Sequence, residues 1–165
     1  MNTVKINIAL YRGTSWISKA IRFMSWGIYS HASIVMPDGT NYESWDGVGV
    51  RSCPNISYGH TPKTRVDFFE IEMQADQLEL LECALQSQLG KKYDYKGVLR
   101  FCPALRFFMR DSPSKREQAR WFCSEYVCWA LEEAGIILLN KPCWKISPSD
   151  IPSSPIVRYT SSAYT

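Results

Sequence analysis

The sequence predicts an α+β fold in which an antiparallel sheet packs against helices. Two observations lead to this class. Short strand-like runs separated by turns fill much of the first half, and segments with helical spacing precede and follow them. The 165 residues show no repeat, low-complexity tract or linker. We therefore expect a single domain that spans residues 1–165.

The strands are predicted from alternating or β-branched residues that end at turn residues. They are expected at residues 5–12, 29–36, 41–45, 47–51, 66–73 and 156–159. The first helix begins after Thr14 or Ser15, which can cap it, and ends at Gly27. Its apolar side chains at helical spacing should face one side; these are Trp16, Ile17, Ala20, Ile21 and Met24. A second amphipathic helix is expected over residues 74–89, before Gly90.

Composition indicates an ordinary globular protein, since 45% of residues are hydrophobic and 21% are charged. The N-terminus lacks the basic and apolar pattern of a secretory signal, and no apolar run approaches the ~20 residues of a membrane span. We expect a protein that is cytoplasmic or released without a signal peptide, and not transmembrane. Six unevenly spaced cysteines in such a chain favour reduced thiols.

The net charge of +3 is unevenly distributed. Residues 66–90 contain six acids and no Lys or Arg, whereas Lys91–Arg120 contains nine bases against three acids. The basic stretch could contact an anionic partner or a membrane surface, and its apolar residues could hold a lipid tail. The alternative is two solvated faces of opposite charge. Aromatic residues are interleaved with these bases, but no nucleic-acid-binding motif is recognisable, so we expect no nucleic-acid partner.

The run from Trp121 to Leu131 reads as the first turns of a buried helix with Cys123 at its start, and Gly135 ends it. Five side chains at helical spacing should face the interior: Cys123, Val127, Ala130, Leu131 and Ala134. The free N–H groups and the dipole of a helix start favour thiolate over thiol. Cys123 is thus a candidate nucleophile, and the alternative is a small core residue. Cys128, about 140° further around the helix, is interpreted as packing.

A cysteine nucleophile needs a base, and the chain has two histidines. His31 lies in a predicted strand, whereas His60 lies in a Gly- and Pro-flanked loop that is less suited to catalysis. Glu43 follows His31 by twelve residues, across the turn at residues 37–40. A hairpin centred near residues 37–38 pairs positions 31 and 43, so that the carboxylate could orient the imidazole.

Three segments resemble the NlpC-type papain-like cysteine hydrolases. The stretch "SHASIVMPDGTNYES" resembles their histidine hairpin, "WFCSEYVCWAL" their nucleophile helix, and "LGKKYDYKG" the Gly-x-x-Tyr segment that precedes it. The histidine hairpin comes first here, which is the circularly permuted order of the YiiX-like hydrolases and the lecithin–retinol acyltransferase relatives. The resemblance implies a permuted papain-like fold, with Cys123 as nucleophile, His31 as base, Glu43 as orienting residue and Tyr93 near the oxyanion. Many relatives carry His, Asn or Gln where Glu43 stands.

The resemblance implies a cysteine peptidase or amidase that works through a covalent acyl-enzyme, with cell-wall peptides as plausible substrates. Two alternatives stay open: a lipid-directed acyl hydrolase or acyltransferase at the same site, and a non-catalytic binding module. The stretch 98–120 is longer and more basic than the resemblance predicts and is a candidate substrate-binding insertion. We expect no cofactor. A metal site from Cys53, His60 and Cys143 lacks the paired spacing of zinc motifs, so no metal is expected either.

Overall fold

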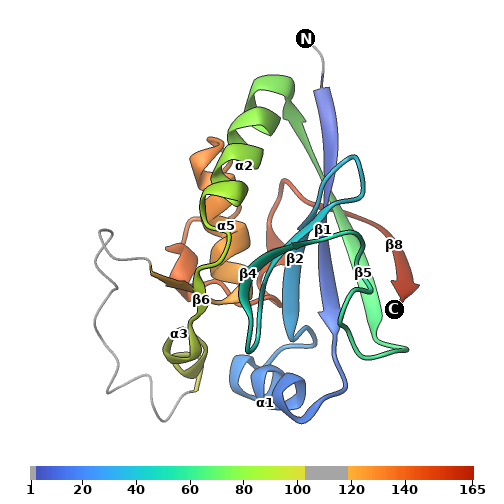
Figure 1. Ribbon diagram of the computed structural model, residues 1–165, viewed down its shortest axis with the longest axis vertical. Helices are drawn as coiled ribbons and strands as arrows, with labels where there is room; N and C mark the ends of the chain where they lie inside the picture. Colours follow the sequence, from blue (N-terminus) through green and yellow to red (C-terminus); the bar gives the residue numbers. More distant parts are fainter. Residues whose placement is uncertain (1–2, 103–118) are drawn as a thin grey trace.

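The computed structural model describes residues 3–102 and 119–165, and within them an antiparallel sheet has the strand order β4-β3-β2-β1-β5-β8 (Figure 1). Its strands are β1 (Thr3–Arg12), β2 (His31–Val35), β3 (Asn41–Trp45), β4 (Gly49–Cys53), β5 (Arg65–Gln74) and β8 (Arg158–Tyr164). The remaining elements among the described residues are α1 (Trp16–Ser25), α2 (Ala75–Ser87), β6 (Lys92–Tyr93), α3 (Tyr95–Leu99), β7 (Arg120–Trp121), α5 (Cys123–Glu133), and the 3-10 turns η1 (Cys143–Lys145) and η2 (Ile151–Ser153). The predicted α+β class is confirmed.

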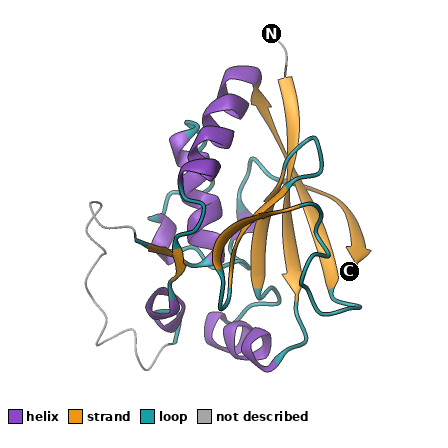
Figure 2. Cartoon of the chain, in the orientation of Figure 1, coloured by secondary structure: helices purple, strands orange, loops and turns teal. Residues whose placement is uncertain are grey.

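Helices α2 and α5 cover one face of the sheet, as Figure 2 shows. Alternate residues of β1 and β2 turn towards them, since Ile8, Leu10 and Ile34 are fully buried in the main core cluster. The predicted inward face of α5 is confirmed, because all five of its members are buried; they are Cys123, Val127, Ala130, Leu131 and Ala134.

The opposite face of the central strands is covered by a loop. Tyr11 of β1 belongs to a small second cluster with Ala9 and Val66, and Ile56 from the loop between β4 and β5 packs on it. Side chains that alternate with the core-facing ones, including His31 and Glu43, therefore lie beneath this loop rather than beneath α2.

The pairing of β2 with β3 differs by two residues from the expected one. Glu43 lies opposite Ser33, not opposite His31. The turn is tighter and later than predicted, since the Met36 N–H donates to the Thr40 carbonyl and the Gly39 N–H donates to Met36. A shift of two residues keeps every side chain on its face, so His31 and Glu43 remain on the same side as diagonal neighbours.

Helix α1 begins where predicted, with the Ser15 hydroxyl accepting a hydrogen bond from the Ser18 N–H, but its predicted inward face is wrong in part. Trp16 is 87% exposed and Ala20 is also exposed, whereas Ile21 and Met24 are half-buried. The last strand was expected at residues 156–159 and forms instead at Arg158–Tyr164. The predicted insertion at 98–120 falls mostly on residues 103–118, outside the described residues.

The expectation of reduced thiols is wrong for two cysteines. Cys128 and Cys143 form a disulfide that ties α5 to η1, so Cys128 is more than a packing residue. Among the described residues Cys53, Cys83, Cys102 and Cys123 are free. In the part of the chain that the structure describes, no helix has the length and apolar character to cross a membrane.

Candidate active site

Two segments, β3 and the residue after β6, donate hydrogen bonds to the carbonyl of Trp121, two residues before Cys123. The Ser44 hydroxyl of β3 donates to this carbonyl at 2.7 Å, and the Asp94 N–H donates to it at 2.9 Å. Strands β6 and β7 are paired in parallel with Tyr93 beside Trp121. This junction fixes the start of α5 next to β3, and so brings Cys123 to the strand that carries Glu43.

A glycine makes this junction possible. Gly49 begins β4 with a φ of +97°, which favours glycine, and a Cβ there would collide with the backbone of Lys91. The close approach lets the Val50 N–H donate to the Lys91 carbonyl at 2.8 Å. This hydrogen bond holds the segment that leads into Tyr93 against β4, at the edge of the sheet.

The structure brings together His31, Glu43, Cys123 and Tyr93. The His31 Nε2 lies 2.7 Å from Glu43 Oε2, and the Cys123 side chain is close enough to His31 to raise the pKa of its imidazole. Because Nε2 is occupied by Glu43, Nδ1 is the ring nitrogen left for the thiol. Tyr93, from β6, is buried close enough for the charge of Cys123 to affect its hydroxyl.

Glu43 is fully buried and accepts hydrogen bonds from several sides. Arg51, directly opposite on β4, donates to Oε1 from Nε at 2.9 Å and from Nη2 at 2.6 Å. His60 Nε2 lies 3.1 Å from Oε2, and the Cys53 thiol donates to Oε1. Burial alone raises the pKa of Glu43, but hydrogen bonds with the two histidines outweigh it and hold that pKa well below its usual range. The carboxylate therefore stays charged.

The electrostatics of His31 favour its protonated form. Burial lowers the pKa of His31, but hydrogen bonds with Cys123 and Glu43 and their negative charges outweigh burial and raise it to about 9. The Trp45 ring packs edge-on against the His31 ring, and the Tyr11 ring packs against it at a tilt; both ring centroids lie 5.2 Å from that of His31. These rings limit the orientations of the imidazole.

The Tyr93 hydroxyl, which lies near the thiol, and the Glu125 carboxyl are both held neutral. Burial and the charge of Cys123 raise the pKa of Tyr93 well above its usual value, so its hydroxyl keeps a proton to donate. Burial and the charge of Asp94 raise the pKa of Glu125, in the first turn of α5, to about 8. At neutral pH this carboxyl is mostly protonated and adds little negative charge to the first turn of α5.

His60, Arg51 and Cys53 were not predicted as part of the site. His60 stacks on Tyr11 with ring centroids 4.1 Å apart and reaches Glu43 because the 54–64 loop folds over this face of the sheet. The nitrogens and oxygen of His31, Glu43 and His60 lie within 4.8 Å of one another, so this group could hold a metal ion. Cys143 is in the disulfide with Cys128 and is therefore not available as a metal ligand together with Cys53 and His60.

The thiol itself is little exposed, with Cys123 at 2% and His31 at 9%. A small apolar slot of about 180 Å³ opens beside Tyr93, between α1 and α3, and is lined by Ile21, Asp46, Tyr93, Tyr95, Val98 and Leu99. This slot adjoins the residue that lies next to the thiol.

No protein-family model matches the sequence, and no curated protein matches it. The fold is similar to a crystal structure described as metalloprotein YiiX, DUF1105, from Escherichia coli O157:H7. The two chains superpose with a TM-score of 0.63 over 96% of this chain and 97% of that one, at 18% sequence identity. The chain therefore has a YiiX-like fold.

Proposed function

We propose that this protein is a cysteine hydrolase with a permuted papain-like arrangement, in which Cys123 is the nucleophile, His31 the base and Glu43 the orienting carboxylate. One observation carries the proposal: a cysteine at a helix start lies close enough to a histidine to raise the pKa of its ring, and that ring is held 2.7 Å from a buried carboxylate. A merely structural cysteine needs neither partner.

The first step is attack on an acyl carbonyl. His31 holds the proton of Cys123 as an imidazolium, and the thiolate sulfur forms a bond to the carbonyl carbon while the carbonyl π pair moves to oxygen. The backbone N–H of Cys123 at the start of α5 and the protonated hydroxyl of Tyr93 are the donors for that oxyanion. Collapse of the intermediate expels the leaving group, which takes the proton from His31.

The second step releases the acyl group. Neutral His31 takes a proton from a water molecule, whose oxygen attacks the thioester carbon, and the Cys123 sulfur leaves and regains its place beside the imidazolium. Glu43 stays ionised throughout and stabilises that imidazolium. Arg51 fixes the carboxylate by two hydrogen bonds, so that Oε2 stays directed at His31.

The substrate class follows from the resemblance and is a peptide or amide, with cell-wall peptides the first to test. An acyl lipid is the alternative, because the slot beside Tyr93 is almost wholly apolar. Covalent capture of an ester probe separates either enzyme from a binding module, and turnover of cell-wall peptides against acyl lipids separates the two substrate classes.

The test of the nucleophile is labelling with iodoacetamide at pH 6 followed by peptide mapping. An ordinary thiol has a pKa of about 8.5 and reacts slowly at this pH. Cys123 should react much faster than the exposed Cys83, and His31→Ala should remove the preference. Equal rates at the two cysteines, or a preference that survives His31→Ala, would refute the proposal.

A second candidate function is metal binding by His31, Glu43 and His60. Two imidazoles and one carboxylate are a common donor set for zinc, and the similar crystal structure is described as a metalloprotein. The atoms are close enough to fit, although the guanidinium of Arg51 on the same carboxylate opposes a cation. A bound zinc would act as a Lewis acid on a carbonyl or on water. These residues would then no longer serve Cys123.

To test this candidate, the protein is dialysed first against zinc and then against zinc-free buffer, and the zinc that it retains is measured. Retention of one equivalent that His60→Ala abolishes, together with zinc-dependent loss of Cys123 labelling, favours the metal. A protein that retains no zinc, or that keeps it in His60→Ala, excludes this set of ligands. His60→Ala should leave the labelling preference of Cys123 intact when no metal is present.

A further inference from the structure

Helix α1 points its largest apolar side chains away from the protein. Trp16 is 87% exposed, Phe23 79% and Trp26, at the C-cap, 83%, and the rings of Phe23 and Trp26 stack at 6.4 Å. Single exposed apolar residues are ordinary, but three aromatic rings on one short helix form a patch that calls for a partner.

The charges around this patch are positive. Helix α1 contains Lys19 and Arg22 and no acid, and Lys19 Nζ lies 5.3 Å from the ring centroid of Trp16. Aromatic side chains on one side of a helix, with Lys and Arg beside them, are typical of helices that lie in the interface of an anionic membrane. Basic residues of this kind also disfavour a second copy, because a twofold contact would bring the same cations together.

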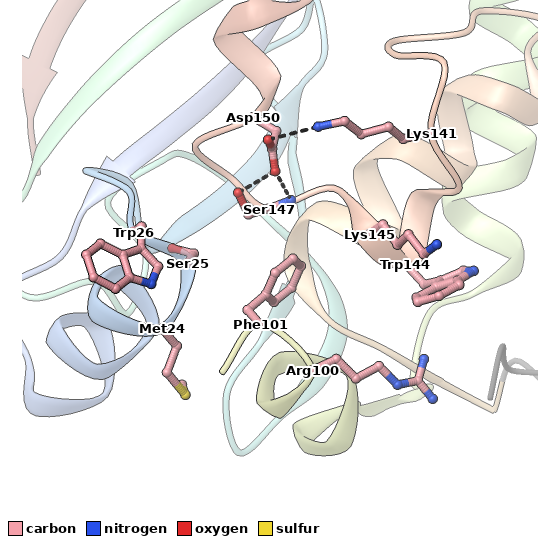
Figure 3. Close-up of a pocket in the computed structure, with 10 residues that line it drawn as sticks. All are labelled: Met24, Ser25, Trp26, Arg100, Phe101, Lys141, Trp144, Lys145, Ser147 and Asp150. Atoms are coloured by element: carbon pink, nitrogen blue, oxygen red, sulfur yellow. Dashed lines mark hydrogen bonds and ion pairs between the residues drawn. The ribbon is translucent and has the colours of Figure 1, made fainter. Parts of the chain in front are cut away.

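A basic cavity of about 790 Å³ lies next to this patch, between α1, α3 and the segment after α5 (Figure 3). Three aromatic and three basic side chains line it: Trp26, Phe101, Trp144, Arg100, Lys141 and Lys145. The one acid among its described lining residues is Asp150, which already accepts hydrogen bonds from Ser147 and pairs with Lys141 at 3.3 Å. The cavity thus offers positive charge across from Trp26, which is the member of the exposed patch that lines it.

We propose that α1 docks this protein on an anionic phospholipid surface, with its aromatic rings in the membrane interface and the basic residues of the adjacent cavity against lipid phosphates. The proposal depends on both the exposed rings of α1 and the basic cavity. The rings account for contact with an apolar layer, and Arg100 and Lys145 account for a preference for negative headgroups. Free phosphate would use the cavity alone and leave the rings in water.

Docking through α1 also has a consequence for the candidate active site. Ile21, on the inner side of the same helix, lines the slot that leads to Tyr93. A membrane against α1 would therefore place acyl chains near the mouth of this slot. This consequence rests on the proposed function, whereas the docking itself does not depend on Cys123.

Co-sedimentation with vesicles tests the proposal. Vesicles of phosphatidylcholine alone are compared with vesicles of equal parts phosphatidylcholine and phosphatidylglycerol. We expect binding to the anionic vesicles that weakens with salt, and a loss of about tenfold or more in affinity in Trp16→Ser/Phe23→Ser. The matched control is Leu80→Ser/Ile137→Ser, which removes exposed apolar side chains elsewhere and should bind as wild type. Lys145→Glu should weaken binding only to the anionic vesicles.

Three outcomes overturn the proposal. They are a wild-type protein that does not sediment with anionic vesicles, binding that survives Trp16→Ser/Phe23→Ser, and self-association in light scattering that the same double variant abolishes. Cys123→Ser should bind vesicles as wild type, so vesicle binding and Cys123 labelling can fail independently. Circular dichroism of each variant confirms that it is folded.

Discussion

Replacing Glu43 by Gln should separate the role of this carboxylate in the site from its role in stability. The amide has nearly the same shape but no charge, so Arg51 and His31 each lose a buried anionic partner. Removing one partner of a buried ion pair costs about 3–5 kcal/mol of the free energy of unfolding. Without the charge of Glu43, one of the two groups that oppose burial is lost, so the pKa of His31 falls from about 9 and the imidazolium beside Cys123 is less stable.

The chain offers a matched control in Asp67. This carboxylate is also buried and accepts hydrogen bonds from Arg12 and Arg65, which help to lower its pKa to about 2 against burial. Asp67→Asn should therefore lower the free energy of unfolding by a similar amount, but Asp67 lies outside the group formed by Cys123, His31 and Glu43.

The assay combines urea unfolding with the rate of iodoacetamide labelling between pH 5 and pH 9, and labelling is measured without urea, where both variants are folded. Both substitutions should lower the free energy of unfolding, whereas only Glu43→Gln should slow labelling of Cys123 at pH 6. The reasoning is wrong if Glu43→Gln keeps the wild-type pH profile, or if Asp67→Asn changes it to the same extent.

Further predictions concern the backbone, the pH and the disulfide. Gly49→Ala should lower the free energy of unfolding by about 2 kcal/mol or more, measured by thermal unfolding. Gly39 also has a positive φ but has open space around it, so Gly39→Ala should lower this free energy by about 1 kcal/mol. The pKa of His31 is raised from 6.5 to about 9 in the folded protein, so protonated His31 stabilises the fold fully below pH 6.5 and this stabilisation disappears as pH rises through 9. Urea midpoints measured across this range should decline, and His31→Asn should lack the decline. Replacing Cys128 and Cys143 by Ser should lower the free energy of unfolding by about 3 kcal/mol, because the disulfide joins cysteines with a sequence separation of 15. The rate of Cys123 labelling should stay unchanged.

Local sequence patterns predict the elements that carry the site better than they predict the contacts between them. The alternation around His31 and Glu43 fixes which face of the sheet each side chain takes, and this survives a two-residue error in the register. The register depends on how the turn closes at residues 36–40, and several closures suit the same Pro-Asp-Gly sequence.

Contacts made by irregular segments could not be read from spacing. His60 reaches Glu43 because a loop with no period folds over the sheet, and Cys128 meets Cys143 because η1 packs on α5. The outward face of α1 was missed for a different reason. Apolar spacing marks a face that needs a partner, but it does not tell whether that partner is the protein's own core.

The two candidate uses of this site compete for one oxygen atom. Arg51 occupies Oε1 of Glu43 with two hydrogen bonds, so Oε2 is the atom that both histidines share. If Oε2 binds a metal together with Nε2 of His31, that nitrogen can no longer hold the proton that orients the ring towards Cys123. A metal at this position would therefore inhibit thiol chemistry rather than assist it. The positive charge of Arg51, which stabilises the carboxylate for an imidazolium, makes the same carboxylate a weaker ligand, and this favours the cysteine as the working group of the site.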